Sequence, residues 1–470
     1  ELPVRALFEA PTVAGLVRKL DTASSARPPL RRRIRPEALP LSLPQRRLWA
    51  LHRLEERGTL YSLPLVTRLR GELDRVALEQ ALADVVTRHE SLRTVYPEID
   101  GEPRQVVLDP QRARPRLHVA DASQADVAGV LAAMRSQGFS LETEPPLRVT
   151  LLEMGPAEHV LVGVLHHIAG DGWSLGPLAA DLATAYAARC RGKAPDWAPL
   201  PVQYADYTLW QREVLGDASD PGSEMSRQLA YWKETLAGIP DCLTLPADFP
   251  RPAEQSHRGA VVPFELAPDL HEGLVSLAKS TGTSVFMVFQ AALAALLTRL
   301  GAGTDIPIGA PIAGRTDDAL DDLVGFFVNT LVLRTDTSGD PTFRELLARV
   351  RETDLAAYAH QDVPFERVVD AVNPTRSLAH HPLFQVMLTL ETFARSESVA
   401  ATGLTTEPVT DGPLSAGPDG AKFDLTVRLA ERRSLEGHGS SGVVGSIAYA
   451  EDLFDRSSVE SVVVGFVRLL

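Results

Sequence analysis

The chain is poor in cysteine, in positive charge and in long apolar runs. Its 470 residues include two cysteines, Cys190 and Cys242, and carry a formal net charge of −14. Two cysteines set no disulfide framework, so free thiols in a reducing cytoplasm are expected. The negative charge argues against nucleic acid as a partner. No apolar stretch approaches the roughly 18 residues of a membrane span, and the N-terminus lacks a signal-peptide layout. The sequence therefore predicts a cytoplasmic protein that binds neither nucleic acid nor membrane.

What is present is the composition of a globular protein. Hydrophobic residues make up 44% and charged residues 23% of the chain, which are ordinary values for a folded domain. The length predicts two or three folding units rather than one core. The chain opens on Glu1 without a methionine and ends at Leu470 inside an apolar run. We therefore expect it to be a fragment of a longer polypeptide.

Residues 159–174 are the most informative segment for chemistry. A run rich in Val and Leu predicts a buried strand and leads into His166 and His167, and Asp171 and Gly172 follow. Side chains on a strand alternate between its two faces, so the two histidines cannot both face the same cavity. We expect one imidazole to face a cavity, where it could act as a general base, and the other to face the core.

Two other interpretations compete with a catalytic histidine. A histidine after an apolar run is usually a structural residue that is hydrogen-bonded in the core. A metal site is the second alternative, but the spacing is not the His-Glu-x-x-His pattern of a zinc helix, and no cysteine lies near the motif. The residues alone therefore favour neither a metal nor an unambiguous catalytic role.

Six further segments stand in order around this motif. They are residues 42–49, 88–94, 204–211, 309–315 with 324–330, 360–366 and 381–385. Together with His166-His167-x-x-x-Asp171-Gly172, they resemble the motifs of the condensation domains of nonribosomal peptide synthetases. These domains are a branch of the chloramphenicol-acetyltransferase-like acyltransferases. The first segment departs from the family pattern because Pro44 stands where Ala is usual.

The periodic patterns predict a mixture of helices and strands. Helices are expected after a cap at Asp74, over residues 121–138, 175–188, 227–237 and 341–357, and in two segments of 270–301 separated at Gly282. Strands are expected over residues 65–69, 147–153, 159–166, 261–266, 306–310, 330–334, 384–390 and 442–449. The alternation favours an α/β (α+β two-layer) fold. The resemblance implies two chloramphenicol-acetyltransferase-like lobes that form a V-shaped pseudo-dimer with a central tunnel.

The lobes are expected over residues 39–215 and 216–470, because a polar stretch near 216–222 marks a boundary. Thr12 can cap a short amphipathic helix, and residues 1–21 resemble the C-terminal remnant of a peptidyl carrier domain. Residues 22–38 are rich in Ser, Ala, Pro and Arg, which predicts a linker. Its five arginines could contact an acidic partner, but we expect them to be solvated.

The resemblance implies formation of an amide between two thioester-bound groups. The acceptor amine would attack the carbonyl of the donor thioester. An α-amino group has a pKa of about 8, so a neutral imidazole could take its proton or orient it. The resemblance gives this role to His167, as base or as positioning group. Gly172 would bring a backbone N–H close to the reacting carbonyl, and with Gly170 it would allow backbone conformations that a side chain disfavours.

The resemblance assigns five further residues to the site. His166, Asp171 and Arg315 would support it structurally. A bidentate pair between Arg315 and Asp171 would keep the carboxylate ionised and fix its geometry. Trp173 and Asn329 would line the substrate tunnel, with a core aromatic and a turn-capping amide as their respective alternatives.

No metal and no intrinsic cofactor are expected, because Gly301-Ala302-Gly303 lacks the lysine of a phosphate loop. The 4'-phosphopantetheine arms would arrive on an upstream donor carrier domain and a downstream acceptor carrier domain. An adjacent adenylation domain is expected, and the fragment itself is expected to be monomeric. The remnant of a carrier runs directly into the lobes, so we expect an L-configured donor and an L-configured acceptor.

Related activities fit the sequence less well. An epimerisation domain would differ at residues 42–49 and 326–330, and a heterocyclising domain would have Asp in place of His166. A freestanding acyltransferase that uses coenzyme A would not usually follow a carrier tail. Relatives that serve as docking platforms for other proteins typically have a degraded histidine motif, and here the motif is intact.

Overall fold

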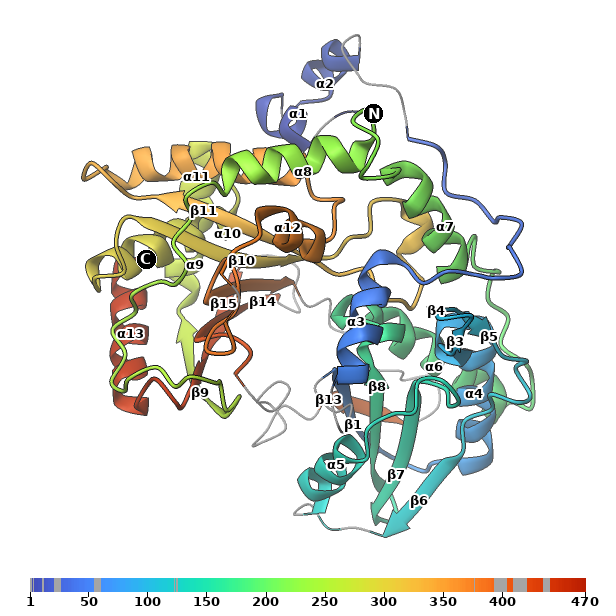
Figure 1. Cartoon of the computed structure of the whole chain (residues 1–470). Coiled ribbons are helices and arrows are strands. Elements are labelled where there is room, and N and C mark those ends of the chain that lie inside the picture. The colour runs from blue at the N-terminus through green and yellow to red at the C-terminus, as the bar shows by residue number, and fades with distance from the viewer. Residues whose placement is uncertain are drawn as a thin grey trace.

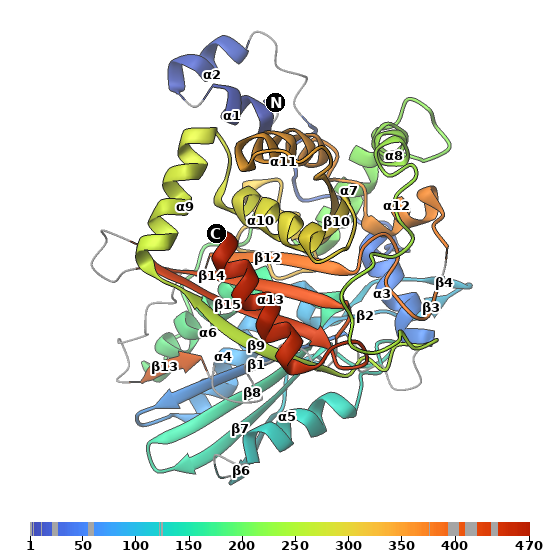
Figure 2. The same ribbon diagram turned by 90° about the vertical axis from the view of Figure 1, so that its left-hand side faces the viewer.

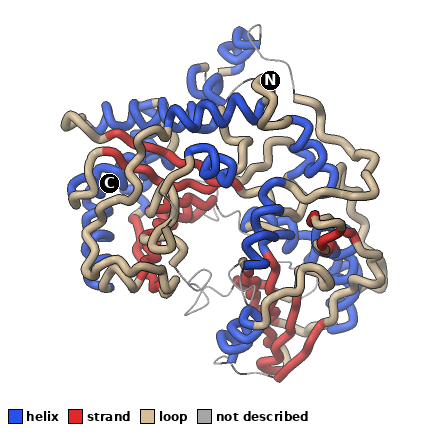
Figure 3. Tube along the Cα trace, in the orientation of Figure 1, coloured by secondary structure: helices blue, strands red, loops and turns tan. Residues whose placement is uncertain are grey.

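The chain forms two lobes, each built around its own β-sheet (Figure 1). The computed structural model describes residues 2, 4–10, 12–20, 27–54, 61–121, 123, 126–375, 377–392, 404–408, 421–433 and 440–470. Figure 3 shows helices packed around the strands of both lobes, which diverge as a V. The expected α/β fold with two lobes is confirmed, and the central tunnel stays a prediction.

The N-lobe contains a five-stranded sheet in the order β13-β1-β8-β7-β6. Its strands are β1 (Ser62–Arg70), β6 (Leu117–Asp121), β7 (Leu147–Gly155), β8 (Glu158–His166) and β13 (Thr405–Pro408). Its helices are α3 (Leu43–Leu54), α4 (Arg75–Arg88), α5 (Asp126–Ser136), α6 (Leu175–Cys190) and α7 (Tyr204–Leu215). The short strands β2 (Thr94–Val95) and β5 (Val106–Val107) form one pair, and β3 (Glu98–Ile99) and β4 (Glu102–Pro103) form another.

The two faces of the N-lobe sheet have different covers. Leu78 of α4 and Ala185 of α6 pack with Leu151 of β7 on one face. On the opposite face, Leu131 of α5 packs with Val162 of β8. Because the residues of β8 alternate between these faces, the strand delivers its last residue to the face that α5 covers.

The C-lobe contains a six-stranded sheet in the order β11-β10-β12-β14-β15-β9 (Figure 2). Its strands are β9 (Gly259–Leu266), β10 (Asp305–Ile312), β11 (Asn329–Asp336), β12 (Val386–Thr392), β14 (Leu425–Arg433) and β15 (Ser440–Ala450). Its helices are α8 (Glu224–Thr235), α9 (Pro268–Thr281), α10 (Val285–Arg299), α11 (Phe343–Tyr358), α12 (Phe365–Val372) and α13 (Arg456–Leu469). Leu274, Phe289 and Phe466, from α9, α10 and α13, pack against one face of this sheet.

Two parts of the C-terminal half belong structurally to the N-lobe. Strand β13 pairs antiparallel with β1, with Thr405 opposite Arg70. The segment 320–328 inserts Leu323, Val324 and Phe327 into the N-lobe core. The expected division of the chain at residue 215 therefore needs two exceptions.

Local sequence signals locate many of the elements. Asp74 caps α4 and accepts a hydrogen bond from the Ala77 amide at 2.9 Å, and Gly282 ends α9 in the left-handed conformation with φ 63°. Within α4, Val76 faces solvent with an exposed fraction of 64%. The helix turns Ala77 and Leu78 toward α6 instead. Helices α3, α7, α12 and α13 and strand β14 were not predicted.

The expectation of solvated arginines before the N-lobe is wrong for the described residues 27–38. Arg27 forms a bidentate ion pair with Asp362 of the C-lobe, with both N–O distances 2.8 Å. Arg35 pairs with Glu90 of the N-lobe at 2.7 Å. The predicted linker thus fastens to both lobes; its residues 22–26 lie outside the described part of the chain.

Two short helices precede this segment. Thr12 accepts a hydrogen bond from the Gly15 amide at 3.1 Å, and the expected helix is α2 (Val13–Leu20). Helix α1 (Val4–Glu9) was not predicted. Arg5 of α1 pairs with Glu352 of α11 at 2.7 Å. That residues 1–21 are a carrier remnant stays a prediction.

Among the described residues, we find no single helix that could cross a membrane. No single helix is long and apolar enough, and only α9 and α10 taken together reach the necessary length and composition, with a bend of 101° between them.

A carboxyl group lies buried in the C-lobe core, on α11. Asp354 has no exposed surface, and its Oδ1 accepts a hydrogen bond from Gln290 Nε2 at 3.0 Å. Its Oδ2 has no partner among the residues that the structure describes. Burial raises the pKa of Asp354 to about 8, because the low-dielectric interior disfavours the charged form.

We expect Asp354→Asn to stabilise the protein increasingly as the pH rises. An unfolded aspartate has a pKa of about 3.9, so above roughly pH 4 the unfolded state has lost a proton that the folded state retains until about pH 8. The free energy of unfolding contributed by Asp354 therefore falls across this window by up to about 1.4 kcal/mol per pH unit. Denaturant titrations at about pH 5 and about pH 8 would measure the difference between variant and wild type. The exposed Asp318→Asn serves as control, and equal pH dependence in all three proteins would contradict the expectation.

Candidate active site

The end of β8 separates the two histidines. His166 is the last residue of the strand and is fully buried. Its Nδ1 accepts a hydrogen bond from the Ile168 amide at 3.1 Å, and its ring meets the edges of His52 and Phe139 at centroid distances of 5.3 and 5.8 Å. His166 therefore belongs to the N-lobe core, as expected of a supporting residue.

His167 begins a short 3-10 turn (His167–Ala169) and faces the lobe junction. Its amide donates to the Tyr61 carbonyl at 2.7 Å, and its Nδ1 lies 3.0 Å from the Gly170 carbonyl oxygen. Because a carbonyl oxygen only accepts, Nδ1 is assigned the proton, and Nε2 is left as an acceptor. Phe326 of the C-lobe packs edge-on against the ring at 5.3 Å. The side chain is half-buried rather than sealed.

Burial keeps both imidazoles neutral. It lowers the pKa of His166 to about 3, and the neighbouring His52 and His167 lower it further. It also lowers the pKa of His167 to about 3, where the positive charge of Lys422 acts in the same direction. The hydrogen bond to the Gly170 carbonyl opposes this decrease. At neutral pH His167 is therefore a neutral hydrogen-bond acceptor at Nε2.

Asp171 joins the histidine loop to the segment 320–328, which comes from the C-terminal half of the chain and packs in the N-lobe core. Its carboxylate is fully buried, and Oδ2 accepts hydrogen bonds from the amides of Phe327 and Val328 at 2.8 and 3.0 Å. Oδ1 accepts from the Ser174 amide and hydroxyl at 3.0 and 2.9 Å. Burial raises the pKa of Asp171, while Arg315 and these donors lower it. Because all four donors present hydrogen to the carboxyl oxygens, the ionised form fits the site.

The expected bidentate pair between Asp171 and Arg315 is not present. The nearest guanidinium nitrogen lies 3.8 Å from Asp171 Oδ1. Arg315 instead donates to Ser174 Oγ at 3.1 Å and to the Leu320 carbonyl, and it stacks over the Phe327 ring at 4.4 Å. Backbone amides have taken the bidentate place at the carboxylate, so Arg315 acts on Asp171 mainly through Ser174 and through its charge.

Neither glycine of the loop has unusual dihedral angles, and only Gly170 lies where a side chain would lack space. Gly170 has an extended backbone with φ −168°, but a Cβ there would lie 2.6 Å from Leu165 Cδ2. At Gly172 the backbone is not left-handed, and a Cβ would meet nothing within 4 Å. The expected conformational role is therefore wrong for both residues. Gly172 is exposed, so it leaves open space beside the loop.

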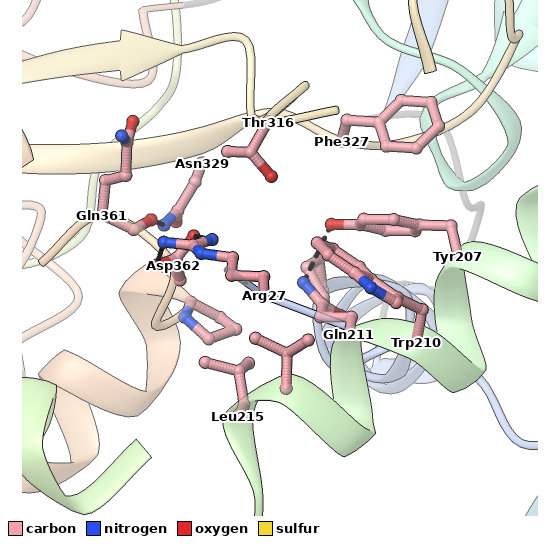
Figure 4. Close-up of a pocket in the computed structure, with 14 residues that line it drawn as sticks. Arg27, Tyr207, Trp210, Gln211, Leu215, Thr316, Phe327, Asn329, Gln361 and Asp362 are labelled. Atoms are coloured by element: carbon pink, nitrogen blue, oxygen red, sulfur yellow. Dashed lines mark hydrogen bonds and ion pairs between the residues drawn. The ribbon is translucent and has the colours of Figure 1, made fainter. Parts of the chain in front are cut away.

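The two expected tunnel residues lie in different surroundings. Trp173 has an exposed fraction of 43%, which excludes a core role. Asn329 lines a pocket between the lobes together with Tyr207, Trp210 and Asp362 (Figure 4). His167 is not among the residues that line this pocket. A continuous path from the pocket to the histidine therefore stays a prediction.

The Asn329 amide is fully engaged by protein. Its Nδ2 donates to the carbonyls of Gln361 and Val363 at 2.9 and 2.8 Å. Its Oδ1 accepts from the amides of Thr330 and Phe365, both at 2.9 Å. The side chain thus holds β11 to the start of α12, in agreement with the alternative of a capping amide. A contact to substrate would have to displace these bonds.

Several residues of the site were not identified from the sequence. Ser174 bridges Asp171 and Arg315, and its position three residues after Asp171 is the spacing of a capping box, which was a usable signal. Gln45 of α3 holds the loop through the Ile168 carbonyl at 3.0 Å. Lys422, which lies 4.8 Å over the Tyr61 ring, gave no signal, because its approach to His167 depends on how the lobes pack.

Among the residues that the structure describes, no group of three or more His, Cys, Asp or Glu side chains could hold a metal ion. The pair His52 and His166 lacks a third ligand there. The groups that converge on the loop are backbone amides, a hydroxyl and a guanidinium. These groups can donate hydrogen bonds to a carboxylate such as that of Asp171.

The chain belongs to the condensation-domain family. The model of this family matches residues 36–470. The chain is 53% identical to a dimodular nonribosomal peptide synthase of Bacillus subtilis (strain 168), covering 100% of this chain and 20% of that protein. It is 48% identical to an isonitrile lipopeptide synthase of Mycobacterium tuberculosis, covering 93% of this chain and 17% of that protein. The chain thus spans a small part of these curated relatives.

Solved structures agree with this membership. A complex of the X-domain and OxyB from teicoplanin biosynthesis matches with a TM-score of 0.85 and 37% identity, over 95% of both chains. A four-domain nonribosomal peptide synthetase bound to AMP and glycine matches with a TM-score of 0.78 and 25% identity, over 93% of this chain and 33% of the other. The resemblance of the seven motifs is confirmed, and the two lobes have the chloramphenicol-acetyltransferase-like fold of the family.

We expect Asp171→Asn to destabilise the protein more than Arg315→Met. The asparagine would turn an N–H₂ group toward donors on one side, so the amides of Phe327 and Val328 or the donors of Ser174 would lose their acceptor, at a cost of roughly 2–4 kcal/mol. In Arg315→Met the carboxylate keeps its four hydrogen bonds. Denaturant titrations would measure both free energies of unfolding. A larger loss in Arg315→Met would show that the guanidinium, and not the backbone, holds the carboxylate.

Proposed function

We propose that this domain forms an amide bond between two thioester-bound substrates in nonribosomal peptide synthesis. The observation that carries the proposal is His167, a neutral and half-buried imidazole whose Nδ1 is held by the Gly170 carbonyl. This arrangement presents Nε2 as an acceptor at the junction of two lobes. Family membership over residues 36–470 supports the same reaction class.

The proposed step balances without an added reagent. The lone pair of the acceptor amine attacks the carbonyl carbon of the donor thioester, and a C–N bond forms. The C–S bond then breaks, and the donor thiol leaves with the proton that the amine has lost. His167 Nε2 accepts a hydrogen bond from the attacking N–H and so orients the nitrogen toward the carbonyl.

The low pKa of His167 favours orientation over removal of a proton from the ammonium form. Proton transfer from an ammonium with a pKa of about 8 to an imidazole with a pKa of about 3 is uphill by roughly 7 kcal/mol. A neutral amine can donate a hydrogen bond to Nε2 without transferring a proton, so this free-energy cost does not arise. We therefore assign His167 as a positioning acceptor that receives the proton only as the amine becomes acidic during attack.

Gly172 and Trp173 are proposed to border the reacting groups. The open space at Gly172 would let a thioester approach the loop backbone, and its N–H would then be available to the developing oxyanion. Trp173 has the exposed surface that a wall of the channel needs. Asn329 would contribute only after its bonds to the segment 361–365 rearrange.

The substrates and partners follow from the class of reaction. Donor and acceptor would arrive on phosphopantetheine arms of an upstream and a downstream carrier domain, with an adenylation domain adjacent in the longer polypeptide and the whole in the cytoplasm. An L-configured donor and acceptor are part of the proposal, because residues 1–21 resemble a carrier tail. No further cofactor enters the step.

A docking platform is the second candidate, because the X-domain in complex with OxyB matches this chain with a TM-score of 0.85. The intact site favours catalysis: His167 is neutral and accessible, and Asp171 is satisfied by four donors. A platform would need neither arrangement. Turnover separates the two candidates.

We expect the chain to join an aminoacyl donor and an aminoacyl acceptor, each loaded on a carrier domain supplied in trans. His167→Ala should lower the rate by about 10²–10⁴-fold, the usual contribution of such a group. The exposed His118→Ala on β6 is the matched control and should retain the wild-type rate. Mass spectrometry would detect the dipeptidyl product. Absence of product with the wild type for every donor and acceptor pair, or equal rates for wild type and His167→Ala, would contradict the proposal.

The pH dependence distinguishes positioning from base catalysis. Because the imidazole is neutral above a pKa of about 3, the rate should rise with pH as the acceptor ammonium loses its proton, and not through an inflection of the histidine. The inflection should move when an acceptor of different amine pKa is used, and it should persist in His167→Ala. Single-turnover rates would measure it. An inflection that is independent of the acceptor and disappears with the histidine would contradict the positioning role.

A further inference from the structure

Polar side chains gather on one face of the C-lobe sheet, at strands β12, β14 and β15. Thr389 of β12 lies beside Arg428 of β14 in the parallel pair, and Arg428 lies opposite Ser446 of β15. Glu391 follows two residues after Thr389, so it is on the same face. The intervening residues of these strands, Leu388, Val427 and Ile447 among them, are buried on the opposite face. The sheet thus presents charged and hydroxyl groups on a single side.

Three of these groups have no hydrogen bond or ion pair within the described part of the chain. Thr389 Oγ1 is buried without a partner. Glu391 is exposed at the end of β12; its partial burial raises its pKa, and the charge of Arg428 opposes this increase. Burial lowers the pKa of the half-buried Arg428. Burial of charged and polar groups without hydrogen bonds is unfavourable. The side chains of Thr389, Arg428 and Glu391 can therefore still donate or accept hydrogen bonds.

This face is the one directed away from the helices that cover the C-lobe. Helices α9, α10 and α13 lie on the opposite side of the sheet, and among the described residues the N-lobe lies beyond the side that carries Arg428 (Figures 1 and 2). Helices α8 and α12 reach this side near β10, β11 and the start of β12, where Trp232 and Val368 pack with Val332 and Met387. Thr389 and Arg428 lie past this cover.

The same strand starts next to the histidine. Lys422, three residues before β14, lies over the Tyr61 ring and acts electrostatically on His167. A strand advances about 3.3 Å per residue, so Arg428 lies within roughly 20 Å of Lys422 along the chain. This distance is comparable to the length of an extended phosphopantetheine arm. Arg428 is thus placed to contact the part of a substrate that is remote from its reacting carbonyl.

We propose that Arg428, Glu391 and Thr389 form a subsite for the amide groups of a tethered substrate chain. The guanidinium would donate to an amide carbonyl, the carboxylate would accept from an amide N–H, and the Thr389 hydroxyl would bind either. An anion would be repelled by Glu391 and a cation by Arg428, whereas an amide offers both a donor and an acceptor. The amide could belong to the pantetheine arm or to a peptidyl group. This inference rests on the proposed function, since it places substrate at the lobe junction.

Binding of stable thioether analogues to the full chain tests the subsite separately from turnover. The probes are a dipeptidyl thioether of phosphopantetheine, an octyl thioether of phosphopantetheine, and dipeptidyl and octyl thioethers of N-acetylcysteamine. Calorimetry would give Kd for wild type, Arg428→Met, Glu391→Gln and the control Arg432→Met. Arg432 is on the same strand, but it is exposed and paired with Glu265. We expect Arg428→Met and Glu391→Gln to raise Kd of the dipeptidyl phosphopantetheine probe by about tenfold, with no change in Arg432→Met.

The four probes identify the source of the amide. An increase in Kd that is lost with the octyl group locates the subsite at the peptidyl part. An increase that is lost when the arm is shortened to N-acetylcysteamine locates it at the pantetheine arm. The subsite is refuted if Kd is unchanged in Arg428→Met, if Arg432→Met has the same effect, or if no probe binds the wild type. Failure of the condensation assay with intact probe binding would refute the reaction and leave the subsite standing.

Discussion

The buried carboxylate of Asp171 is the interaction on which the arrangement of the site depends. It lies at the end of the histidine loop in the N-lobe, and it accepts the amides of Phe327 and Val328 from the C-terminal half of the chain. An isolated buried carboxylate would be strongly unfavourable. Its burial is possible only while those amides are in place, so the loop conformation and its contact with the segment 320–328 are formed together. Phe326, next to these amides, packs against the His167 ring.

This connection supports the proposal that Asp171 holds the loop in shape and takes no part in proton transfer. Every lone pair of Asp171 that the geometry makes available is directed at an N–H or O–H group of the protein. His167, in contrast, uses only Nδ1 within the loop. The carboxylate of Asp171 is satisfied within the protein, whereas the proposed function gives His167 Nε2 a hydrogen bond to substrate. Holding two tethered reactants at such a point can contribute more to rate than proton transfer does.

Local patterns were sufficient for the parts of the fold that depend on neighbouring residues. The strand that ends at His166, the cap at Asp74 and the break at Gly282 each follow from a few adjacent side chains. The two histidines do lie in different surroundings, but His167 lies in a 3-10 turn after the strand, so alternation along a strand is not the cause. The resemblance of the seven motifs predicted the two lobes. It also predicted that Arg315 lies near Asp171.

What failed depends on contacts between distant residues. The pairing of Arg27 with Asp362 and the entry of β13 into the N-lobe sheet join segments more than 300 residues apart, and no local pattern encodes them. The bidentate pair was wrong because backbone amides, which every sequence has, compete with a guanidinium for the same oxygens. The glycine roles were wrong because space around a Cβ is a property of packing. Lys422 and the polar face of β12 and β14 became visible only once the strand registers were known.

Amide hydrogen exchange at Phe327 and Val328 tests the role of Asp171 most directly. If the buried carboxylate holds these two amides, they exchange as slowly as the amides in the centre of β8, through the same global opening. Exchange at the rate of an exposed loop, with β8 still protected, would show that the lobes are joined without this interaction and would contradict the account.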